Sequence, residues 1–211
     1  MKKRIFAVVM TLLVTVMCFA GCGADTSLVG KWKCEMDYTD EMNEGFAQGL
    51  GLSGQEMAEY IVFTDFVLTI DLEFTQDGWR YMSIDLDSLK EQADKNKAVI
   101  ENGLRAYLID ALISGGYEAS DLDAYLEETG IDPAAVAEEA MGEAFIQAQK
   151  AAFTDSSKYS VSDGKLFTFG EDEIANPDLY ESFTLEGDVL TFTSASDGTT
   201  GYPITFKKVT E

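Results

Sequence analysis

Residues 66–85 read FVLTIDLEFTQDGWRYMSID, and this stretch decides the fold because it contains two strand patterns joined by a turn. From Phe66 to Phe74 every second residue is large and apolar, whereas the residues between them are mostly polar. This alternation predicts a half-buried β-strand. Asp77-Gly78 is a dipeptide typical of hairpins, so we expect residues 79–85 to return as an antiparallel strand.

Further strands are expected on both sides of this hairpin. Residues 31–38 also alternate, with Trp32 and Cys34 on one face. After residue 157, turn dipeptides such as Asp163-Gly164 separate short apolar runs. The strands expected there cover residues 158–161, 165–169, 180–185, 189–194 and 202–209. The chain thus carries eight strand patterns, and eight antiparallel strands can close into a barrel that is filled by side chains or holds one small ligand.

Between the third and fourth strands, at about residues 88–153, the apolar spacing changes from two residues to the 3.6 of a helix. Residues 88–113 predict one long helix. Its apolar face is expected to comprise Leu89, Ala93, Ile100, Leu104, Leu108 and Ala111. Two short helices are also expected near residues 39–50 and 55–60.

The rest of this insertion predicts two more helices. Ser120 with Asp123 is expected to start a short helix that ends at Gly130. Asp132-Pro133 is expected to start another helix that extends to about residue 153. That helix carries an alanine stripe, interpreted as a helix-packing face, which comprises Ala137, Ala140, Ala144, Ala148 and Ala151.

The sequence Gly30-Lys31-Trp32 at the start of the first strand resembles the Gly-x-Trp signature of the lipocalins. In that family the glycine permits a tight entry into the barrel base, the tryptophan closes the base, and a basic side chain of the last strand lies across the indole. The resemblance assigns these roles to Gly30, Trp32 and Lys208, although lysine replaces the usual arginine. The contact between Lys208 and Trp32 would be a cation–π interaction.

More specifically, the chain resembles the lipocalin-like lipoproteins of Gram-positive gut bacteria, which are largely uncharacterised. The shared features are the Gly-x-Trp start, an Asp-Gly turn before an aromatic strand, and the closing sequence YPITFKK at residues 202–208. The resemblance covers residues 28–87 and 158–209. It implies an eight-stranded antiparallel lipocalin-like barrel but leaves the helices unexplained, because a long helical insertion is foreign to ordinary lipocalins. Together with the helical pattern, it predicts an α+β, mainly β fold in which the barrel domain occupies residues 30–209 and a helical insertion separates its third and fourth strands.

The N-terminal residues indicate export. Lys2, Lys3 and Arg4 precede an uncharged run at residues 5–17, which is too short to span a bilayer. Ala20-Gly21-Cys22 resembles a bacterial lipobox, so residues 1–21 are expected to be a lipoprotein signal peptide and 22–29 a lipidated tether. Acyl chains on Cys22 would hold the protein on the extracellular face of the cell membrane. The alternative is an ordinary secretory signal.

The composition excludes several classes of function. The 211 residues include 38 acidic and 15 basic side chains, a formal net charge of -23, so we expect no nucleic-acid partner because phosphates require a basic surface. Histidine is absent, which excludes Ser-His-Asp and Cys-His nucleophiles and imidazole metal sites. Once Cys18 leaves with the signal and Cys22 is lipidated, Cys34 has no disulfide partner and is expected to be buried.

Acidic residues are too abundant for any one pair to indicate a site. Asp85, Asp87 and Glu91 lack the glycine and the terminal glutamate of a calcium-binding loop, so Asp87 or Ser88 is expected to cap a helix instead. We expect no metal, no cofactor and no catalytic residue. A glycan hydrolase that uses two carboxylates is a minor alternative.

Two functions remain open. In the first, the protein is a non-enzymatic binding protein whose barrel holds a small apolar or amphipathic ligand. The candidate cavity or core residues are Phe66, Leu68, Ile70, Leu72, Trp79, Tyr81, Phe167, Phe169, Phe183 and Phe192. In the second, these side chains form a packed core, and the acidic exterior is an interaction module for a cationic protein partner.

Overall fold

The computed structural model describes residues 27–50, 55–199 and 201–210. The expected signal peptide at residues 1–21, the lipidated Cys22 and most of the tether lie outside these ranges. Among the described residues, no helix is long and apolar enough to cross a membrane.

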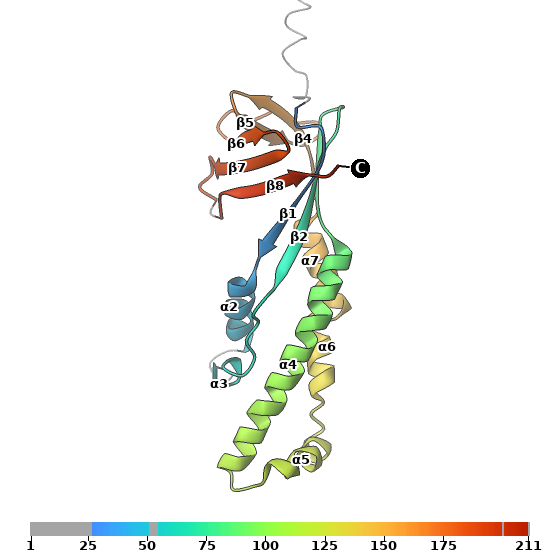
Figure 1. The fold of residues 1–211 in the computed structure, drawn as a ribbon, viewed down its shortest axis with the longest axis vertical. Helices are drawn as coiled ribbons and strands as arrows, with labels where there is room; N and C mark the ends of the chain where they lie inside the picture. Colours follow the sequence, from blue (N-terminus) through green and yellow to red (C-terminus); the bar gives the residue numbers. More distant parts are fainter. Residues whose placement is uncertain (1–26, 51–54, 200, 211) are drawn as a thin grey trace, which may run out of the picture. The chain divides into compact units, whose positions relative to one another are not determined.

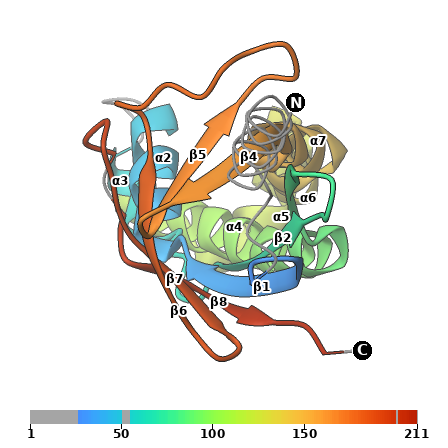
Figure 2. The same ribbon diagram turned by 90° about the horizontal axis from the view of Figure 1, so that it is seen from above.

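Within the described residues, eight strands pair in chain order and close into an antiparallel barrel (Figures 1 and 2). The strands are β1 (Gly30–Asp37), β2 (Val67–Phe74), β3 (Trp79–Ile84), β4 (Asp155–Ser162), β5 (Lys165–Phe169), β6 (Glu181–Glu186), β7 (Val189–Ala195) and β8 (Ile204–Lys208). The barrel closes where β1 pairs with β8, with Trp32 opposite Lys208 and Lys33 opposite Lys207. This arrangement confirms the predicted fold class.

The helices occupy two connections (Figure 1). Between β1 and β2 lie α2 (Thr39–Leu50) and α3 (Gln55–Ala58). Between β3 and β4 lie α4 (Leu86–Ser114), the 3-10 turn η2 (Ala119–Asp121), α5 (Leu122–Thr129), α6 (Pro133–Met141) and α7 (Glu143–Phe153). The predicted insertion between the third and fourth strands is therefore confirmed.

The chain divides into two compact units. The described residues of the barrel unit fall within Met1–Cys34, Asp71–Met82 and Asp155–Glu211, and those of the helical unit fall within Glu35–Ile70 and Ser83–Thr154. Strands β1, β2 and β3 contribute residues to both units.

Large apolar side chains fill the core of the barrel unit. The buried residues are Leu28, Trp32, Cys34, Leu72, Phe74, Tyr159, Leu166, Leu190, Phe192 and Phe206. Phe74 meets Tyr159 edge to face with ring centroids 4.9 Å apart, and Phe192 meets Phe206 in the same way at 5.9 Å. Leu72, Phe192 and Cys34 are thus buried, in keeping with the alternation in their strands.

Five of the candidate cavity or core residues are not buried. Tyr81 is 43% exposed, so its assignment to the interior is wrong. Trp79 stacks on Tyr81 with centroids 6.1 Å apart and is half-exposed, as are Phe167, Phe169 and Phe183. The opposite faces of these strands are more buried: on β3 the Arg80 side chain is only 12% exposed and Ile84 is buried, and on β5 Leu166 is fully buried.

The helical unit has its own core. Phe66, Leu68 and Ile70 are buried, and the Phe66 ring meets the Phe145 ring of α7 edge to face at 6.2 Å. The buried face of α4 comprises Leu89, Ala93, Asn96, Ile100, Gly103, Leu104, Leu108 and Leu112. Ala111, which was predicted on this face, is exposed, because Leu112 takes the position one turn after Leu108.

Gly142 divides the helix predicted from Asp132 to about residue 153. Its backbone is extended, which ends α6 and starts α7, and a Cβ atom there would collide with the carbonyl oxygen of Glu138, so a glycine suits this break. The predicted alanine stripe is divided with it. Ala137 is buried, whereas Ala144, Ala148 and Ala151 are exposed and form no packing face.

At two helix starts the capping residues differ from the predicted ones. Asp85 caps α4 by accepting hydrogen bonds from the backbone N–H groups of Asp87 and Ser88, which were the predicted caps. At the start of η2, Glu118 and Asp121 form a capping box, whereas Ser120 with Asp123 was the predicted pair.

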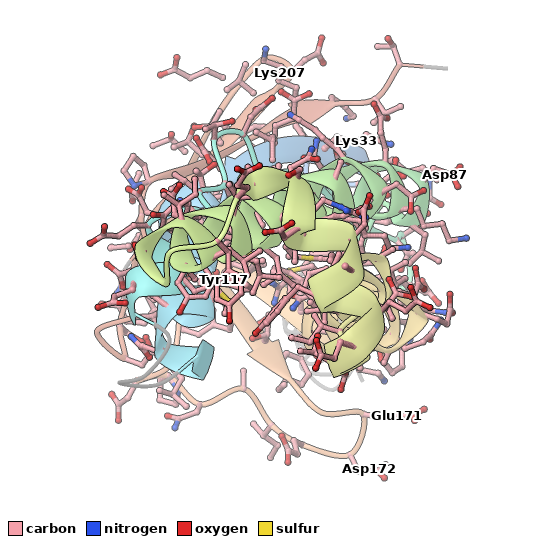
Figure 3. All side chains as sticks on the ribbon, turned by 90° about the horizontal axis from the view of Figure 1, so that it is seen from below. Lys33, Asp87, Tyr117, Glu171, Asp172 and Lys207 are labelled. Atoms are coloured by element: carbon pink, nitrogen blue, oxygen red, sulfur yellow. The ribbon has the colours of Figure 1, made fainter. Side chains whose placement is uncertain are left out.

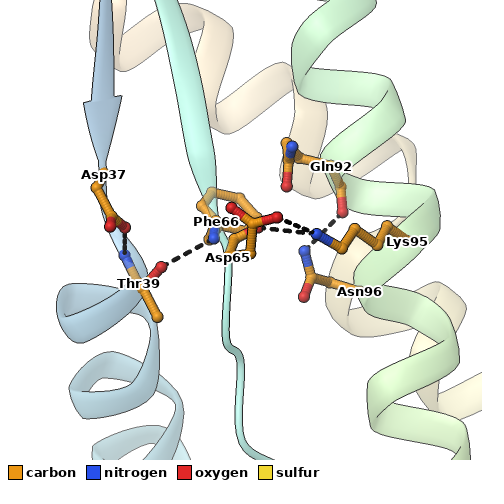
Figure 4. A network of polar contacts seen from close by, with 7 residues as sticks. All are labelled: Asp37, Thr39, Asp65, Phe66, Gln92, Lys95 and Asn96. Carbon is orange, nitrogen blue, oxygen red and sulfur yellow. Dashed lines mark hydrogen bonds and ion pairs between the residues drawn. The ribbon is translucent and has the colours of Figure 1, made fainter.

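A polar network ties the start of β2 to neighbouring elements of the helical unit (Figure 4). Thr39 Oγ1 accepts a 2.9 Å hydrogen bond from the Phe66 N–H, and Lys95 Nζ lies 2.6 Å from Asp65 Oδ2. The side-chain and backbone hydrogen bonds from Thr39 lower the pKa of Asp37 below its usual value. These contacts hold the beginning of β2 against α2 and α4.

Candidate binding pocket in the barrel unit

A pocket of about 300 Å³ opens in the barrel unit where β5 and β7 end and β6 and β8 begin. Consecutive strands of an antiparallel barrel reverse direction, so these termini meet at one end of the barrel. The pocket is lined by Arg80, Thr168, Leu179, Tyr180, Glu181, Ala195, Ser196, Asp197, Thr199 and Tyr202. Small-molecule sites often lie at the mouths of β-barrels.

Arg80 is the cationic side chain in this lining. Its side chain is only 12% exposed, and Nη1 lies 3.8 Å from both Asp155 Oδ2 and Glu181 Oε2. These distances exceed a hydrogen bond, and the contact from Nη2 goes to Met82 Sδ at 3.8 Å. Among the described residues the guanidinium therefore has carboxylate neighbours but no oxygen within hydrogen-bond distance.

Two buried polar atoms near this position have no hydrogen-bond partner among the described residues. They are Arg80 Nε and Ser157 Oγ. Arg80 and Ser157 face each other across β3 and β4, so their side chains leave the sheet on the same side. Buried polar groups nearly always have a hydrogen-bond partner, so two such atoms without one beside a pocket indicate a site where a bound molecule could supply the partner.

Tyr202 and Glu181 form a hydrogen-bonded pair in the lining. The Tyr202 hydroxyl donates a 2.8 Å hydrogen bond to Glu181 Oε1. Burial raises the pKa of Tyr202 above its usual value, and the charge of Glu181 raises it further. The phenol therefore stays protonated and acts as a donor to Glu181, while the other oxygen of Glu181 faces Arg80.

Tyr180, Leu179 and Ala195 supply the apolar part of the lining. Lys165 Nζ lies 4.0 Å from the centroid of the Tyr180 ring, and the Phe167 ring packs beside it at 5.9 Å. The pocket thus combines an aromatic wall with a polar edge that contains one cation and two carboxylates.

None of the ten candidate cavity or core residues lines this pocket. Arg80 was missed because an interior position for Trp79 and Tyr81 places Arg80 on the outer face of the strand, although the apolar Met82 shares a face with Arg80. Tyr202 was recognised only in the closing sequence, and Asp197 was not predicted at a site. Their approach to β3 depends on the closure of the barrel.

The three residues of the lipocalin-type signature form a separate cluster. Lys208 Nζ lies 5.1 Å from the centroid of the Trp32 ring, which is the contact expected from the resemblance. Trp32 is buried, and its indole Nε1–H donates a 2.8 Å hydrogen bond to the Leu28 carbonyl. Gly30 has φ +134°, and a Cβ there would lie 3.0 Å from Lys208 Cε, so a glycine is required.

Within the described residues, no group of three acidic or cysteine side chains is placed to hold a metal ion, and Asp85 acts as a helix cap. No protein-family model, curated protein or solved structure matches the chain.

Proposed function

We propose that this protein is a binding protein whose barrel pocket holds a small amphipathic ligand. The observation that carries the proposal is the position of Arg80, a nearly buried guanidinium that lines a pocket of about 300 Å³ and has no oxygen of a described residue within hydrogen-bond distance. A buried charge is costly unless its hydrogen-bonding capacity is used. A ligand oxygen at the polar edge would use it.

The lining argues for an amphipathic rather than a purely apolar ligand. Tyr180, Leu179 and Ala195 offer apolar contact, whereas Thr168, Ser196 and Thr199 add hydroxyl groups to the charged edge. An apolar ligand would leave these polar groups unpaired after displacing water, and such unpaired groups reduce affinity strongly. The volume lies at the lower end of the usual range for ligand pockets, so the ligand is small.

The charge balance argues against an anionic ligand, and Arg80 requires a ligand that offers a hydrogen-bond acceptor. Glu181 and Asp155 already neutralise Arg80, and Asp197 adds another negative charge to the lining. An anionic ligand would meet repulsion from these carboxylates. A ligand with hydroxyl or carbonyl oxygens can accept from Arg80 without that penalty.

We further propose that the protein is a lipocalin-like lipoprotein, held on the extracellular face of the cell membrane by acyl chains on Cys22. The export pattern of residues 1–21 and the Gly30, Trp32 and Lys208 cluster support this assignment. Mass spectrometry of the membrane fraction should detect a lipidated Cys22, and C22S should release the protein. An unmodified Cys22 in that fraction would contradict the anchor.

Native mass spectrometry of the full-length protein extracted from its membrane tests ligand binding. We expect a co-purifying small molecule that is lost in R80M and Y202F. R105M, which removes an arginine of α4 paired with Glu101, is the matched control and should retain it. A wild-type protein that carries no small molecule would contradict the proposal.

A further inference from the structure

A second hollow, of about 480 Å³, lies in the helical unit. One side is formed by Glu56, Glu59 and Tyr60, in and just after α3. The other side comes from the C-terminal part of α4 and comprises Tyr107, Asp110, Ala111 and Ser114. The spacing of these four residues places them on one face of the helix.

Two tyrosines, Tyr60 and Tyr107, form a packed pair in this groove. The rings of Tyr60 and Tyr107 meet edge to face, with centroids 5.7 Å apart and an interplanar angle of 71°. The Tyr60 hydroxyl donates a 2.7 Å hydrogen bond to Asp110 Oδ2, which fixes its ring against α4. Both rings are half-exposed, so ring surface remains open to a ligand.

Gly103 determines how closely the two sides of the groove approach. It is buried in α4, and a Cβ there would collide with the Tyr60 carbonyl oxygen and with Ile61 Cγ1. The absence of a side chain at Gly103 lets the backbone at Tyr60 lie against the helix. The tyrosine pair is therefore positioned by close packing of the backbone at Tyr60 against α4.

The charged side chains that line the groove are all negative. Its lining includes the carboxylates of Glu56, Glu59 and Asp110 and no basic side chain. Aromatic ring faces also carry negative potential. A groove that combines carboxylates with aromatic ring faces is complementary to a large, diffuse organic cation.

We propose that this groove binds a small organic ammonium ion, with its alkyl groups against the rings of Tyr60 and Tyr107 and its charge beside Asp110 and the two glutamates. Aromatic rings combined with carboxylates are a general means of recognising alkylated ammonium groups. The site belongs to the helical unit and does not depend on the barrel pocket. Its test is therefore independent of the proposed function.

The experiment is an NMR titration of the full-length protein in detergent with tetramethylammonium chloride, exchanged against sodium chloride at constant ionic strength. We expect saturable amide shifts confined to residues 56–60 and 107–114, with a Kd on the order of millimolar because exposed cation–π contacts are weak. n-Butylammonium is the second cationic probe, and uncharged tert-butanol is the neutral control. Shifts that are linear, or that tert-butanol reproduces, would overturn the proposal.

Variants separate the rings from the charges. Y107L should weaken tetramethylammonium binding about two- to fivefold by removing one ring, and D110N should weaken it by a similar factor. Y117L is the matched control, because Tyr117 is 63% exposed beyond the end of α4 and does not line the groove (Figure 3). In D110N the asparagine Oδ1 can still accept the hydrogen bond from the Tyr60 hydroxyl. This variant therefore removes the negative charge but keeps the tyrosine pair in place. Unchanged affinity in both Y107L and D110N would overturn the site.

Discussion

Arg80 of β3 lies 3.8 Å from Glu181 of β6, and both side chains are largely shielded from water. Asp155 of β4 lies at the same distance from Arg80, and Tyr202 donates a hydrogen bond to Glu181. An ionic cluster therefore occupies one end of a barrel whose remaining core is aromatic and aliphatic. This cluster makes the pocket polar and determines which ligands fit it.

The first prediction concerns the coupling of this pair. R80M should lower the free energy of unfolding by about 1–3 kcal/mol, because Glu181 would be left partly buried without its cation. The loss in R80M/E181Q should be smaller than the sum of the losses in R80M and E181Q. Urea unfolding of the wild type, the two single variants and the double variant gives the coupling energy between the two side chains. Strictly additive losses would show that Arg80 and Glu181 do not interact.

The second prediction concerns alkaline pH. The raised pKa of Tyr202 means that the folded state holds this proton more tightly than the unfolded state, so the stabilisation is complete below about pH 10 and is lost as the pH rises above it. The wild-type free energy of unfolding should therefore fall more steeply with pH than that of Y202F. The slope difference for one proton is at most about 1.4 kcal/mol per pH unit, and solvent screening reduces it.

Urea unfolding at several values between about pH 9 and pH 11 measures this difference across the usual tyrosine pKa. Y117F is the control, because Tyr117 is well exposed (Figure 3). Parallel pH profiles for the wild type and Y202F would show that Tyr202 ionises equally in both states.

The third prediction contrasts two helical glycines. G103A should lower the free energy of unfolding by about 1–3 kcal/mol, because the new Cβ would displace the backbone at Tyr60. G45A in α2 should raise it by about 0.5–1 kcal/mol, because a Cβ there has no neighbour within 4 Å and alanine favours a helix. Thermal or urea unfolding distinguishes the two, and stabilisation by G103A would contradict the close approach.

The fourth prediction concerns the cluster at Trp32. K208M should lower the free energy of unfolding by about 0.5–1 kcal/mol, because the methionine keeps the aliphatic cover over Gly30 but removes the cation above the indole. K208R should retain the wild-type stability. Exposed Lys207 provides the control, and K207M should change stability by less than about 0.5 kcal/mol. Equal effects of K208M and K207M would rule out a specific contact with Trp32.

Local pattern in the sequence was sufficient for the element order. The alternation from Phe66 to Phe74 and the Asp77-Gly78 turn predict a hairpin without reference to any distant residue, and the structure contains it as β2 and β3. The helical insertion was predictable for the same reason. Alternation with a period of two and helical spacing with a period of 3.6 are both properties of short segments.

Only the tertiary structure decided which face of β3 turns inward and which residues meet at the pocket. Alternation separates Trp79 and Tyr81 from Arg80 and Met82, but both faces contain large apolar groups, so the pattern alone does not choose between them. Lys158, 5.5 Å from the Trp79 ring centroid, partly covers the outer aromatic pair, and Asp155 and Glu181 compensate the inner arginine. These partners come from β4 and β6, and only barrel closure brings them to β3.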